Sequence, residues 1–364
     1  MPGDGIGPEV TNQAIRVLDT IAKREHHTFD YTFGLIGAGA IDKTGDPLPA
    51  ETIDICRNSD AILLGAVGHP RFDNNPTAKI RPEQGLLRIR KELGLYANLR
   101  PIETIPSLFH LSPIKSHLLE GVDILFVREL TGGIYFGSKT HFPDHSYASD
   151  LCEYTAEEIE RVAHLAFAMA VKRKRKLTLL DKSNVLETSK LWRHIVTGIA
   201  HAYPEVELNL MYVDNASIQL LLNPAQFDVI LTENMFGDIL SDEASVLAGS
   251  LGMLPSASIG DGTALFEPVH GTYPQAEGMD IANPIGAILS AAMMLDHFGL
   301  AKDASSVRSA VVWTIQHGFL TKDLDPMNFY FTSTIGEMVC DCLMNRAEET
   351  VHQSNIQIRK STII

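Results

Sequence analysis

Two aspartates, Asp238 and Asp242, lie four residues apart in the segment ENMFGDILSDEAS. At roughly 100° per residue, a helix places them about 40° apart, on one face. Two like charges there cost stability unless a cation bridges them, and carboxylate oxygens are the ligands that hard divalent ions prefer. Asp214 follows the apolar run VELNLMYV and is a candidate third ligand, because sites in α/β proteins collect at strand ends. The pair alone is equally compatible with a solvated acidic face.

Basic residues are also clustered, in the segment RPEQGLLRIRKELGLYANLRP and at the ends of two apolar runs. Arg128 ends VDILFVR, and Lys182 follows LTLLD. A guanidinium holds a carboxylate through two parallel hydrogen bonds, so the arginines are candidate ligands for a carboxylate substrate. Lys182, beside a metal and arginines, is a candidate general base. The arginines of the first segment would be equally ordinary on a solvated helix.

Two glycine-rich segments fail the dinucleotide fingerprint G-x-G-x-x-G. The first, GDGIGPE, has Pro8 where the last glycine is required, and the second has Asp42. The phosphate-loop pattern G-x-x-x-x-G-K-[ST] is also missing from the sequence. The glycines therefore predict tight turns, and the sequence gives no support to a Rossmann fold.

Short apolar runs alternate with segments of helical periodicity. This alternation is typical of an α/β fold with a mainly parallel sheet, and runs that are apolar on both faces fit strands covered on both sides. Strands are predicted over residues 29–36, 60–67, 122–128, 177–181, 206–213 and 227–232. Helices are predicted over residues 8–24, 155–175, 186–202 and 236–250.

Residues 130–152 interrupt the alternation, because they are rich in glycine, aromatic and polar residues and lack a helical period. They predict an extended hairpin or arm. Such an arm cannot bury its apolar residues alone, so we expect it to pair with a second subunit. A long surface loop is the alternative, although loops of this length are uncommon within a compact domain.

The composition is that of a globular protein, with 364 residues, 45% of them apolar and 21% charged. The formal net charge of −15 disfavours nucleic acid and anionic membranes as partners. The longest apolar run, residues 284–295, is shorter than the roughly 20 residues that a membrane helix needs. The four cysteines are too few for a disulfide scaffold, and the sequence shows no secretory signal pattern. We therefore expect reduced thiols and a cytoplasmic location.

Several motifs occur in a characteristic order between Gly3 and Pro284: GDGIGPEV, RELTGGIYFG, DKSNVLETSKLWR, YVDNASIQL, NMFGDILSDEAS, EPVHG and IANP. With the arginine segment, they resemble the β-decarboxylating dehydrogenases that act on isocitrate, isopropylmalate, homoisocitrate and tartrate. The whole pattern is most similar to the isopropylmalate enzymes. The resemblance implies an α/β fold that is not Rossmann, with two domains around a cleft. Domain 1, residues 1–95 and 248–364, would hold a mainly parallel sheet, and domain 2, residues 96–247, the arm and the dimer contact.

The functional residues of that family carry over to matching positions of this sequence. The catalytic residues are Tyr135 and Lys182, the lysine being contributed by the second subunit of a homodimer with shared active sites. The substrate-binding residues are Glu83, Leu86, Leu87, Arg90, Arg100, Arg128 and Asp214. The metal ligands are Asp238 and Asp242, with Asp214 from the second subunit. The cofactor-binding residues are Ile6, His270, Gly271, Thr272, Tyr273, Gln275 and Asn283. Without the resemblance, His270 would be read as a hydrogen-bonded loop histidine.

The resemblance implies NAD-dependent oxidative decarboxylation of 3-isopropylmalate to 4-methyl-2-oxopentanoate and CO₂, a reaction of leucine biosynthesis. Mg²⁺ or Mn²⁺ would hold the C2 hydroxyl and C1 carboxylate and favour the alkoxide. Lys182 would act as the base, and Tyr135 would protonate C3 after CO₂ leaves. The apolar pair Leu86 and Leu87 favours an isopropyl group, and another malate-type substrate (isocitrate, homoisocitrate or tartrate) is the alternative. A non-catalytic metal-binding relative would lack one of these catalytic groups, and all are present.

Two features depart from the family pattern. Members of the family begin with a short apolar strand before PGDGIGPE, and this sequence shows none, so we expect domain 1 to lack its first strand. Gln275 stands where the isopropylmalate enzymes commonly have an aspartate that binds the adenosine ribose. Glutamine can still bond a hydroxyl, and the Lys-Tyr pair of NADP-type relatives is replaced by Gln275 and Ala276, so we expect NAD.

Overall fold

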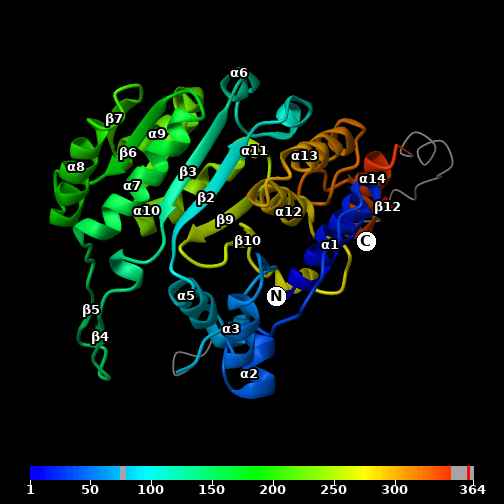
Figure 1. The fold of residues 1–364 in the computed structure, drawn as a ribbon, viewed down its shortest axis with the longest axis horizontal. Coiled ribbons are helices and arrows are strands. Elements are labelled where there is room, and N and C mark those ends of the chain that lie inside the picture. The colour runs from blue at the N-terminus through cyan, green and yellow to red at the C-terminus, as the bar shows by residue number, and fades with distance from the viewer. Residues whose placement is uncertain (74–78, 346–358, 361–364) are drawn as a thin grey trace. The chain divides into compact units, whose positions relative to one another are not determined.

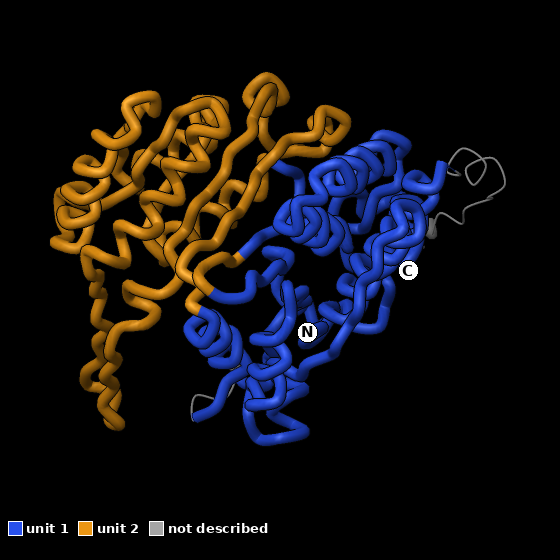
Figure 2. The backbone as a smooth tube through the Cα atoms, in the orientation of Figure 1, with its two compact units in different colours: residues 1–93, 248–257, 262–364 blue, residues 94–247, 258–261 orange. Residues whose placement is uncertain are grey.

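A computed structural model describes residues 1–73, 79–345 and 359–360 of the chain. They form two compact units (Figure 2). Unit 1 comprises Met1–Leu93, Ala248–Ala257 and Gly262–Ile364, and unit 2 comprises Gly94–Leu247 and Ser258–Asp261. Unit 1 is thus built from the two ends of the chain and unit 2 from its middle.

Unit 1 contains the helix predicted over residues 8–24, which forms α1. In α1 the predicted face, which includes Val10, Val17 and Ile21, is buried, and Pro8 stands in the first turn, where its missing N–H costs nothing. The largely apolar α12 is covered by α1, α13 and β10. The elements are α1 (Gly7–Glu25), α2 (Ala38–Thr44), α3 (Ala50–Arg57), β1 (Ile62–Leu63), α4 (Pro70–Asp73), α5 (Glu83–Glu92), η4 (Leu251–Met253), β9 (Pro255–Gly260), β10 (Leu265–Pro268), η5 (Pro274–Ala276), α12 (Ile285–His297), α13 (Ala301–Gln316), β11 (Asn328–Phe329), α14 (Thr332–Leu343) and β12 (Arg359–Lys360).

Unit 2 is a sheet flanked by helices, with strand order β9-β2-β3-β8-β6-β7, where β9 contributes only its last residues (Figure 1). β2 and β3 are antiparallel, whereas β3·β8, β8·β6 and β6·β7 are parallel. The elements are β2 (Leu95–Glu103), η1 (Pro106–Leu111), α6 (Ser116–Leu119), β3 (Asp123–Glu129), η2 (Gly133–Tyr135), β4 (Lys139–His141), β5 (Ala148–Asp150), α7 (Ala156–Val171), β6 (Lys176–Asp181), α8 (Glu187–Ala200), β7 (Glu207–Tyr212), α9 (Val213–Leu222), η3 (Pro224–Gln226), β8 (Val229–Thr232), α10 (Asn234–Glu243) and α11 (Ser245–Ala248).

The parallel pairing in unit 2 decides where its polar residues gather. β8 is buried at all four positions, and α7 packs against β2, β3, β6 and β8. Strands covered in this way leave only their ends for polar side chains. The carboxyl ends of β3, β8, β6 and β7 therefore bring Arg128, Asn234, Lys182 and Asp214 to the same edge of one sheet.

The expected α/β architecture with a mainly parallel sheet is confirmed. Unit 1 contributes one parallel pair, β1 with β10, and the remaining parallel pairs lie in unit 2. Of the predicted helices, residues 236–250 form two shorter ones, α10 and α11. The predicted hairpin is present as β4 and β5, which pair antiparallel with Lys139 opposite Asp150.

The strand predicted over residues 29–36 is wrong, because this segment forms no strand in the structure. A strand needs a neighbour to complete its backbone hydrogen bonds, and no described residue pairs with this backbone as a ladder. The segment instead borders a hollow of about 670 Å³ in unit 1, with Phe33 64% exposed. At the amino terminus, Gly3 forms an isolated parallel bridge with Ala66.

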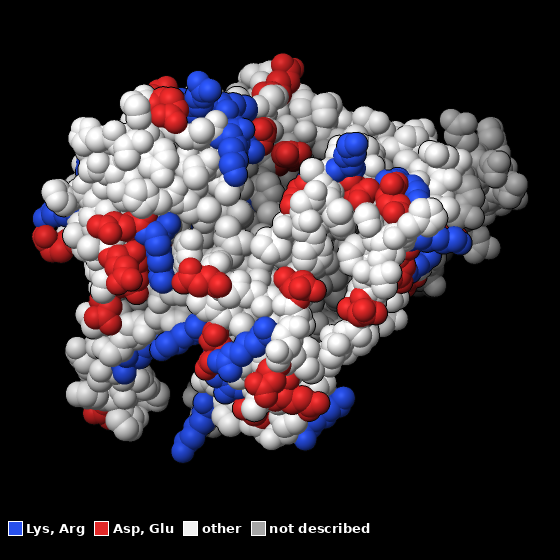
Figure 3. Space-filling view, in the orientation of Figure 1, with Lys and Arg blue, Asp and Glu red and all other residues white. Residues whose placement is uncertain are grey.

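Three surface and side-chain features bear on the expectations from composition. No helix in the described ranges is long and apolar enough to span a bilayer. All four cysteines are free thiols, as predicted. On the face shown in Figure 3, acidic and basic side chains form small, separate groups of both signs.

We predict that Thr155→Ala destabilises unit 2 by about 1 kcal/mol, the typical cost of losing an N-cap side chain. Thr155 and Glu158 form a reciprocal capping box at the start of α7, in which the Thr155 hydroxyl accepts from the Glu158 N–H and the Glu158 carboxylate accepts from the Thr155 N–H at 2.8 Å. Urea unfolding should show the loss, whereas the control Ser305→Ala, at an exposed position in the interior of α13, should leave the midpoint nearly unchanged. Equal midpoints for both variants would contradict the capping role.

Candidate active site

The carboxylate of Asp238 is the centre of a charged cluster in unit 2. It receives hydrogen bonds from Arg128, from Arg100 at 3.4 Å and from the Tyr135 hydroxyl at 3.1 Å. Asp242, one turn further along α10, accepts from Arg100 at 2.9 Å. The structure therefore brings five of the predicted site residues together within one unit.

Both arginines of this cluster are almost fully buried, with 7% of Arg100 and 3% of Arg128 exposed. Arg100 also donates to Asn98 at 2.8 Å and to Ser241 at 2.7 Å. Arg128 donates from Nε to the Asn234 carbonyl at 2.9 Å and from Nη2 to the Asn234 side chain at 2.8 Å. A buried guanidinium needs such partners to offset its lost hydration, so its plane and direction are fixed before any ligand arrives.

Gly237 explains how α10 can approach Arg128 so closely. A Cβ at this position would lie 2.8 Å from Cγ of Arg128 and 2.8 Å from Cγ2 of Thr232. Glycine in a helix interior costs roughly 0.5–1 kcal/mol relative to alanine. Gly237 therefore lowers the stability of α10 slightly but lets Asp238 reach the guanidinium of Arg128.

Burial favours the protonated forms of Tyr135 and Asp242 in this cluster. Burial raises the pKa of Tyr135, and the neighbouring Asp238 raises it further, so the phenol remains a proton donor at neutral pH. Burial also raises the pKa of Asp242, while Arg100 opposes this shift. The arginines of this cluster can bind an anion and its carboxylates can bind a cation. The protonated phenol can deliver a proton.

Lys182 and Asp214 form a separate pair in the same unit, with Nζ and Oδ1 2.7 Å apart. The hydrogen bond from Lys182 lowers the pKa of Asp214, whose side chain is 65% exposed. Within the described ranges, no three His, Cys, Asp or Glu side chains are grouped closely enough to hold a metal. One chain alone therefore does not bring Asp214 to Asp238 and Asp242.

Helix α5 of unit 1 carries the predicted substrate residues Glu83, Leu86, Leu87 and Arg90. Leu86 and Leu87 are half-buried, and Glu83 is exposed beside Gly68. Arg90 is buried and donates to Glu267 of β10 at 2.9 Å. Its Nε is buried and has no hydrogen-bond partner among the described residues, so the arginine retains an unused donor.

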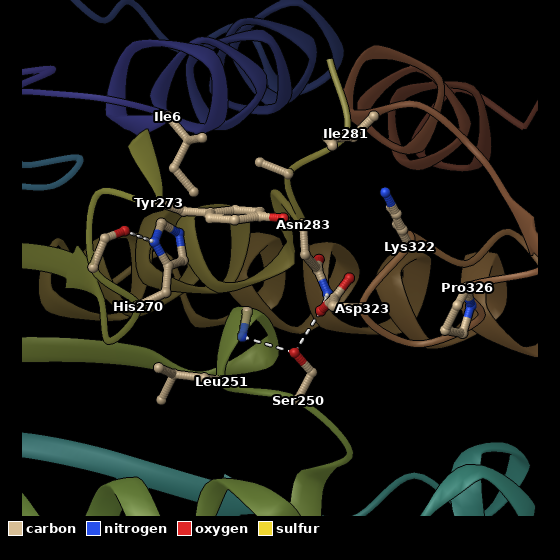
Figure 4. A pocket seen from close by; sticks show the side chains of 13 residues that line it. Ile6, Ser250, Leu251, His270, Tyr273, Ile281, Asn283, Lys322, Asp323 and Pro326 are labelled. Atoms are coloured by element: carbon tan, nitrogen blue, oxygen red, sulfur yellow. Dashed lines mark hydrogen bonds between the residues drawn. The ribbon is translucent and has the colours of Figure 1, made fainter. Parts of the chain in front are cut away.

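A pocket of about 460 Å³ in unit 1 contains most of the predicted cofactor residues (Figure 4). Ile6, His270, Gly271, Tyr273 and Asn283 line it. Thr272 and Gln275 do not belong to the lining. Thr272 is buried, and its carbonyl accepts from the Ile6 N–H at 2.9 Å, whereas Gln275 is exposed on η5.

His270 presents an unused acceptor to this pocket. Its Nδ1 lies 2.9 Å from the Gly271 carbonyl, an acceptor, which assigns the ring proton to Nδ1. Burial lowers the pKa of His270 and favours the neutral ring. Nε2 is then an acceptor, and it is buried without a partner in the described part of the chain.

Sequence reasoning missed several residues that complete these sites. Asn234 and Glu267 fix Arg128 and Arg90, and Asp323 accepts from Asn283 at 3.0 Å in the unit 1 pocket. Ser250 and Lys322 also line that pocket. Asn234 stands within the acidic motif and Glu267 begins the motif EPVHG, so both could have been noticed there, but no local pattern marks Asp323.

Comparison with known proteins identifies the family of this chain. Residues 1–339 match the family model described as isocitrate/isopropylmalate dehydrogenase. The chain is 54% identical over 339 residues to 3-isopropylmalate dehydrogenase of Heyndrickxia coagulans, covering 92% of each protein, and 54% identical over 328 residues to that of Aquifex aeolicus, covering 89% of this chain and 90% of the relative.

Solved structures give the same result. Isocitrate dehydrogenase from Methylococcus capsulatus is 33% identical with a TM-score of 0.85, covering 94% of this chain and 97% of that one. A β-decarboxylating dehydrogenase from Thermococcus kodakarensis is 39% identical with a TM-score of 0.77, covering 97% and 98%. The chain therefore belongs to the isocitrate/isopropylmalate dehydrogenase family of β-decarboxylating enzymes.

Proposed function

We propose that the protein oxidises and decarboxylates 3-isopropylmalate to 4-methyl-2-oxopentanoate and CO₂ in the cytoplasm, with NAD as hydride acceptor, as a step of leucine biosynthesis. The observation that carries this proposal is the cluster in which Asp238 meets Arg100, Arg128 and Tyr135. It joins a carboxylate-binding site, a cation ligand and a proton donor. The names of the relatives in Heyndrickxia coagulans and Aquifex aeolicus support the choice of substrate.

Arg100 and Arg128 bind the carboxylates of the substrate in this proposal. Each presents a buried, pre-oriented guanidinium, so little conformational entropy is lost when an anion binds. Tyr135 keeps its proton at neutral pH and donates it to C3 after CO₂ has left. Lys182 accepts the proton of the C2 hydroxyl.

Asp238 and Asp242 fit a divalent cation, because both present carboxylate oxygens on one face of α10. Asp214, from the second subunit, is the third ligand. Mg²⁺ or Mn²⁺ there would polarise the hydroxyl that is oxidised and the carbonyl that results. The exposed carboxylate of Asp214 supports this role, since it remains accessible on the chain's own surface.

The unit 1 pocket fits the adenosine part of NAD. The unused Nε2 acceptor of His270 suits an amino donor of the adenine ring, and Asn283 and Tyr273 supply further polar groups. Gln275 on η5 carries no charge and would bond a ribose hydroxyl. When bound, the nicotinamide supplies the hydride acceptor.

A homodimer is the second part of the proposal. The region around Lys182 and Asp214 exposes several large apolar side chains, which is typical of an interface surface. They are Val185, Leu186, Leu210, Tyr212, Ile218, Leu222 and Ile239. The β4–β5 arm adds exposed Phe142 and Tyr147. Burying this surface against a second copy would carry Lys182 and Asp214 into the site of that copy.

Asp238→Asn should weaken Mn²⁺ binding and abolish turnover, because the substitution removes one charged ligand from the centre of the cluster. Mn²⁺ titration followed by electron paramagnetic resonance measures binding, and NADH absorbance measures turnover. Asp296→Asn is the matched control, because it removes an exposed carboxylate of α12 that pairs with Arg308 of α13. Mn²⁺ binding and turnover should both be unchanged in this variant. Full activity of Asp238→Asn at limiting Mn²⁺ would contradict the metal site.

Mixing inactive Lys182→Ala subunits with inactive Asp238→Asn subunits should restore activity. One of the two sites in each mixed dimer would combine intact Lys182 with intact Asp238. Turnover is measured after subunit exchange, with dimer formation checked by differently tagged chains. Mixed dimers that form and remain inactive would show that the sites are not shared.

Leu86→Ser combined with Leu87→Asn should reduce the preference for isopropylmalate over isocitrate. Burying an isopropyl group against the leucines contributes about 2 kcal/mol, and a carboxylate placed there would lose hydration without gaining a cation. At about 1.4 kcal/mol per decade, the two effects predict that kcat/KM of the unmodified enzyme is three or more decades higher for isopropylmalate than for isocitrate. NADH formation with each substrate measures the ratio, and Lys91→Ala on the same helix is the control. An unmodified enzyme that uses both substrates equally would refute this pocket assignment.

A further inference from the structure

One arginine connects the ends of the two strands that carry Lys182 and Asp214. Asp181, the last residue of β6, stands opposite Tyr212, the last residue of β7, in the parallel register. Arg193 of α8 donates to Asp181 from Nε at 2.7 Å and from Nη2 at 2.9 Å. Its guanidinium carbon also lies 5.1 Å from the centre of the Tyr212 ring. Arg193 thus contacts both members of the register pair.

The Asp181 carboxylate depends on this arginine. It is 2% exposed, and besides the arginine it accepts a hydrogen bond from the Ser183 N–H at 2.9 Å. A buried carboxylate without a cation carries a large desolvation cost. The bidentate bond also raises the pKa of Arg193 and keeps the guanidinium charged. Charge and geometry therefore hold the two side chains in one arrangement.

The residues that follow this register pair are the ones that the proposed reaction uses. Lys182 comes directly after Asp181, and its backbone N–H donates to Ser189 of α8 at 3.0 Å. Asp214 comes two residues after Tyr212, in the first turn of α9. The 2.7 Å separation of Lys182 Nζ and Asp214 Oδ1 therefore spans two strand ends that Arg193 holds together.

We propose that Arg193 is a positioning residue that sets the geometry of Lys182 and Asp214, and so prepares the half of the active site that one subunit gives to the other. This inference rests on the proposed function. Arg193 itself touches neither substrate nor metal and acts through Asp181 and Tyr212. A lysine in its place would keep the charge but lose the two parallel hydrogen bonds.

Arg193→Met and Arg193→Lys test the role in the intact dimer, with Lys190→Met as the matched control. Lys190 lies on the same helix, and its exposed side chain bonds the exposed Glu187 at 2.6 Å. Loss of a residue that orients metal ligands typically costs 10–100-fold in metal affinity or activity. We expect at least a tenfold rise in the Mn²⁺ concentration for half-maximal activity in both Arg193 variants, and no change in Lys190→Met. Direct Mn²⁺ titration by electron paramagnetic resonance should show the same weakening in the absence of turnover.

Mixed dimers distinguish positioning from a general folding defect. An Arg193→Met subunit mixed with Asp238→Asn should regain activity, because one site combines intact Asp238 with an intact Arg193–Lys182 set. Mixed with Lys182→Ala it should gain nothing, because both defects fall on the same half-site. Rescue by both partners or by neither would overturn the proposal.

The reference mixture of Lys182→Ala with Asp238→Asn separates failure of this inference from failure of the proposed function. An inactive reference mixture contradicts the shared site itself. In that case the Mn²⁺ dependence of the Arg193→Met and Arg193→Lys homodimers still tests the positioning role. Mn²⁺ dependence equal to that of the unmodified enzyme would overturn the proposal for Arg193. If Arg193→Met does not fold, Arg193→Lys provides both measurements with the charge retained.

Discussion

Two buried guanidinium groups impose the main constraint on this protein. Arg100 and Arg128 are held away from water, and charges in that position are tolerated only with well-oriented partners. α10 supplies those partners through Asn234, Asp238 and Ser241. The approach of the helix in turn requires Gly237, since a side chain there would collide with Arg128. The site, the helix and its glycine are thus one connected arrangement.

The location of this arrangement follows from strand direction. Four neighbouring strands of unit 2 run parallel and end at one edge, and each has a polar or charged side chain of the site at or near its end: Arg128, Asn234, Lys182 and Asp214. Buried strands cannot carry such side chains along their length without cost. Reactive side chains placed at the carboxyl ends of the strands therefore disturb the packed core least. At that edge Arg193 bonds the buried carboxylate of Asp181 at the end of β6 and lies against Tyr212 at the end of β7.

Much of this could be read from the sequence. The i, i+4 spacing of Asp238 and Asp242 gave their common helix face, and the apolar runs gave most strands of unit 2. The strand predicted over residues 29–36 was wrong, because an apolar run shows that a segment suits a strand but not that a partner exists. Of the strand predicted over residues 60–67, only the two residues of β1 form a strand. The reason is again the partner, because pairing with β10 is limited to Ile62 and Leu63.

The residues that position others were harder to find. Arg193 lies 12 residues from Asp181, and Asp323 lies 40 residues from Asn283. No period or spacing relates such pairs, because tertiary packing alone brings them together. Tyr135 and His270 were identified through a family resemblance, not through their own spacing. Their chemical setting, a phenol beside a carboxylate and an imidazole nitrogen without a partner, is visible only in three dimensions.

If a cation binds Asp238 as proposed, its carboxylate is shared with two arginines, which has a thermodynamic consequence. Without ligands, its carboxylate neutralises Arg100 and Arg128, so a metal ion that binds it must compete with both guanidinium groups. An anionic substrate must likewise draw the arginines away from Asp238. When both ligands are present, each relieves the competition that the other faces. Binding of metal and substrate is then positively cooperative, and the factor by which one tightens the other is the same in both directions.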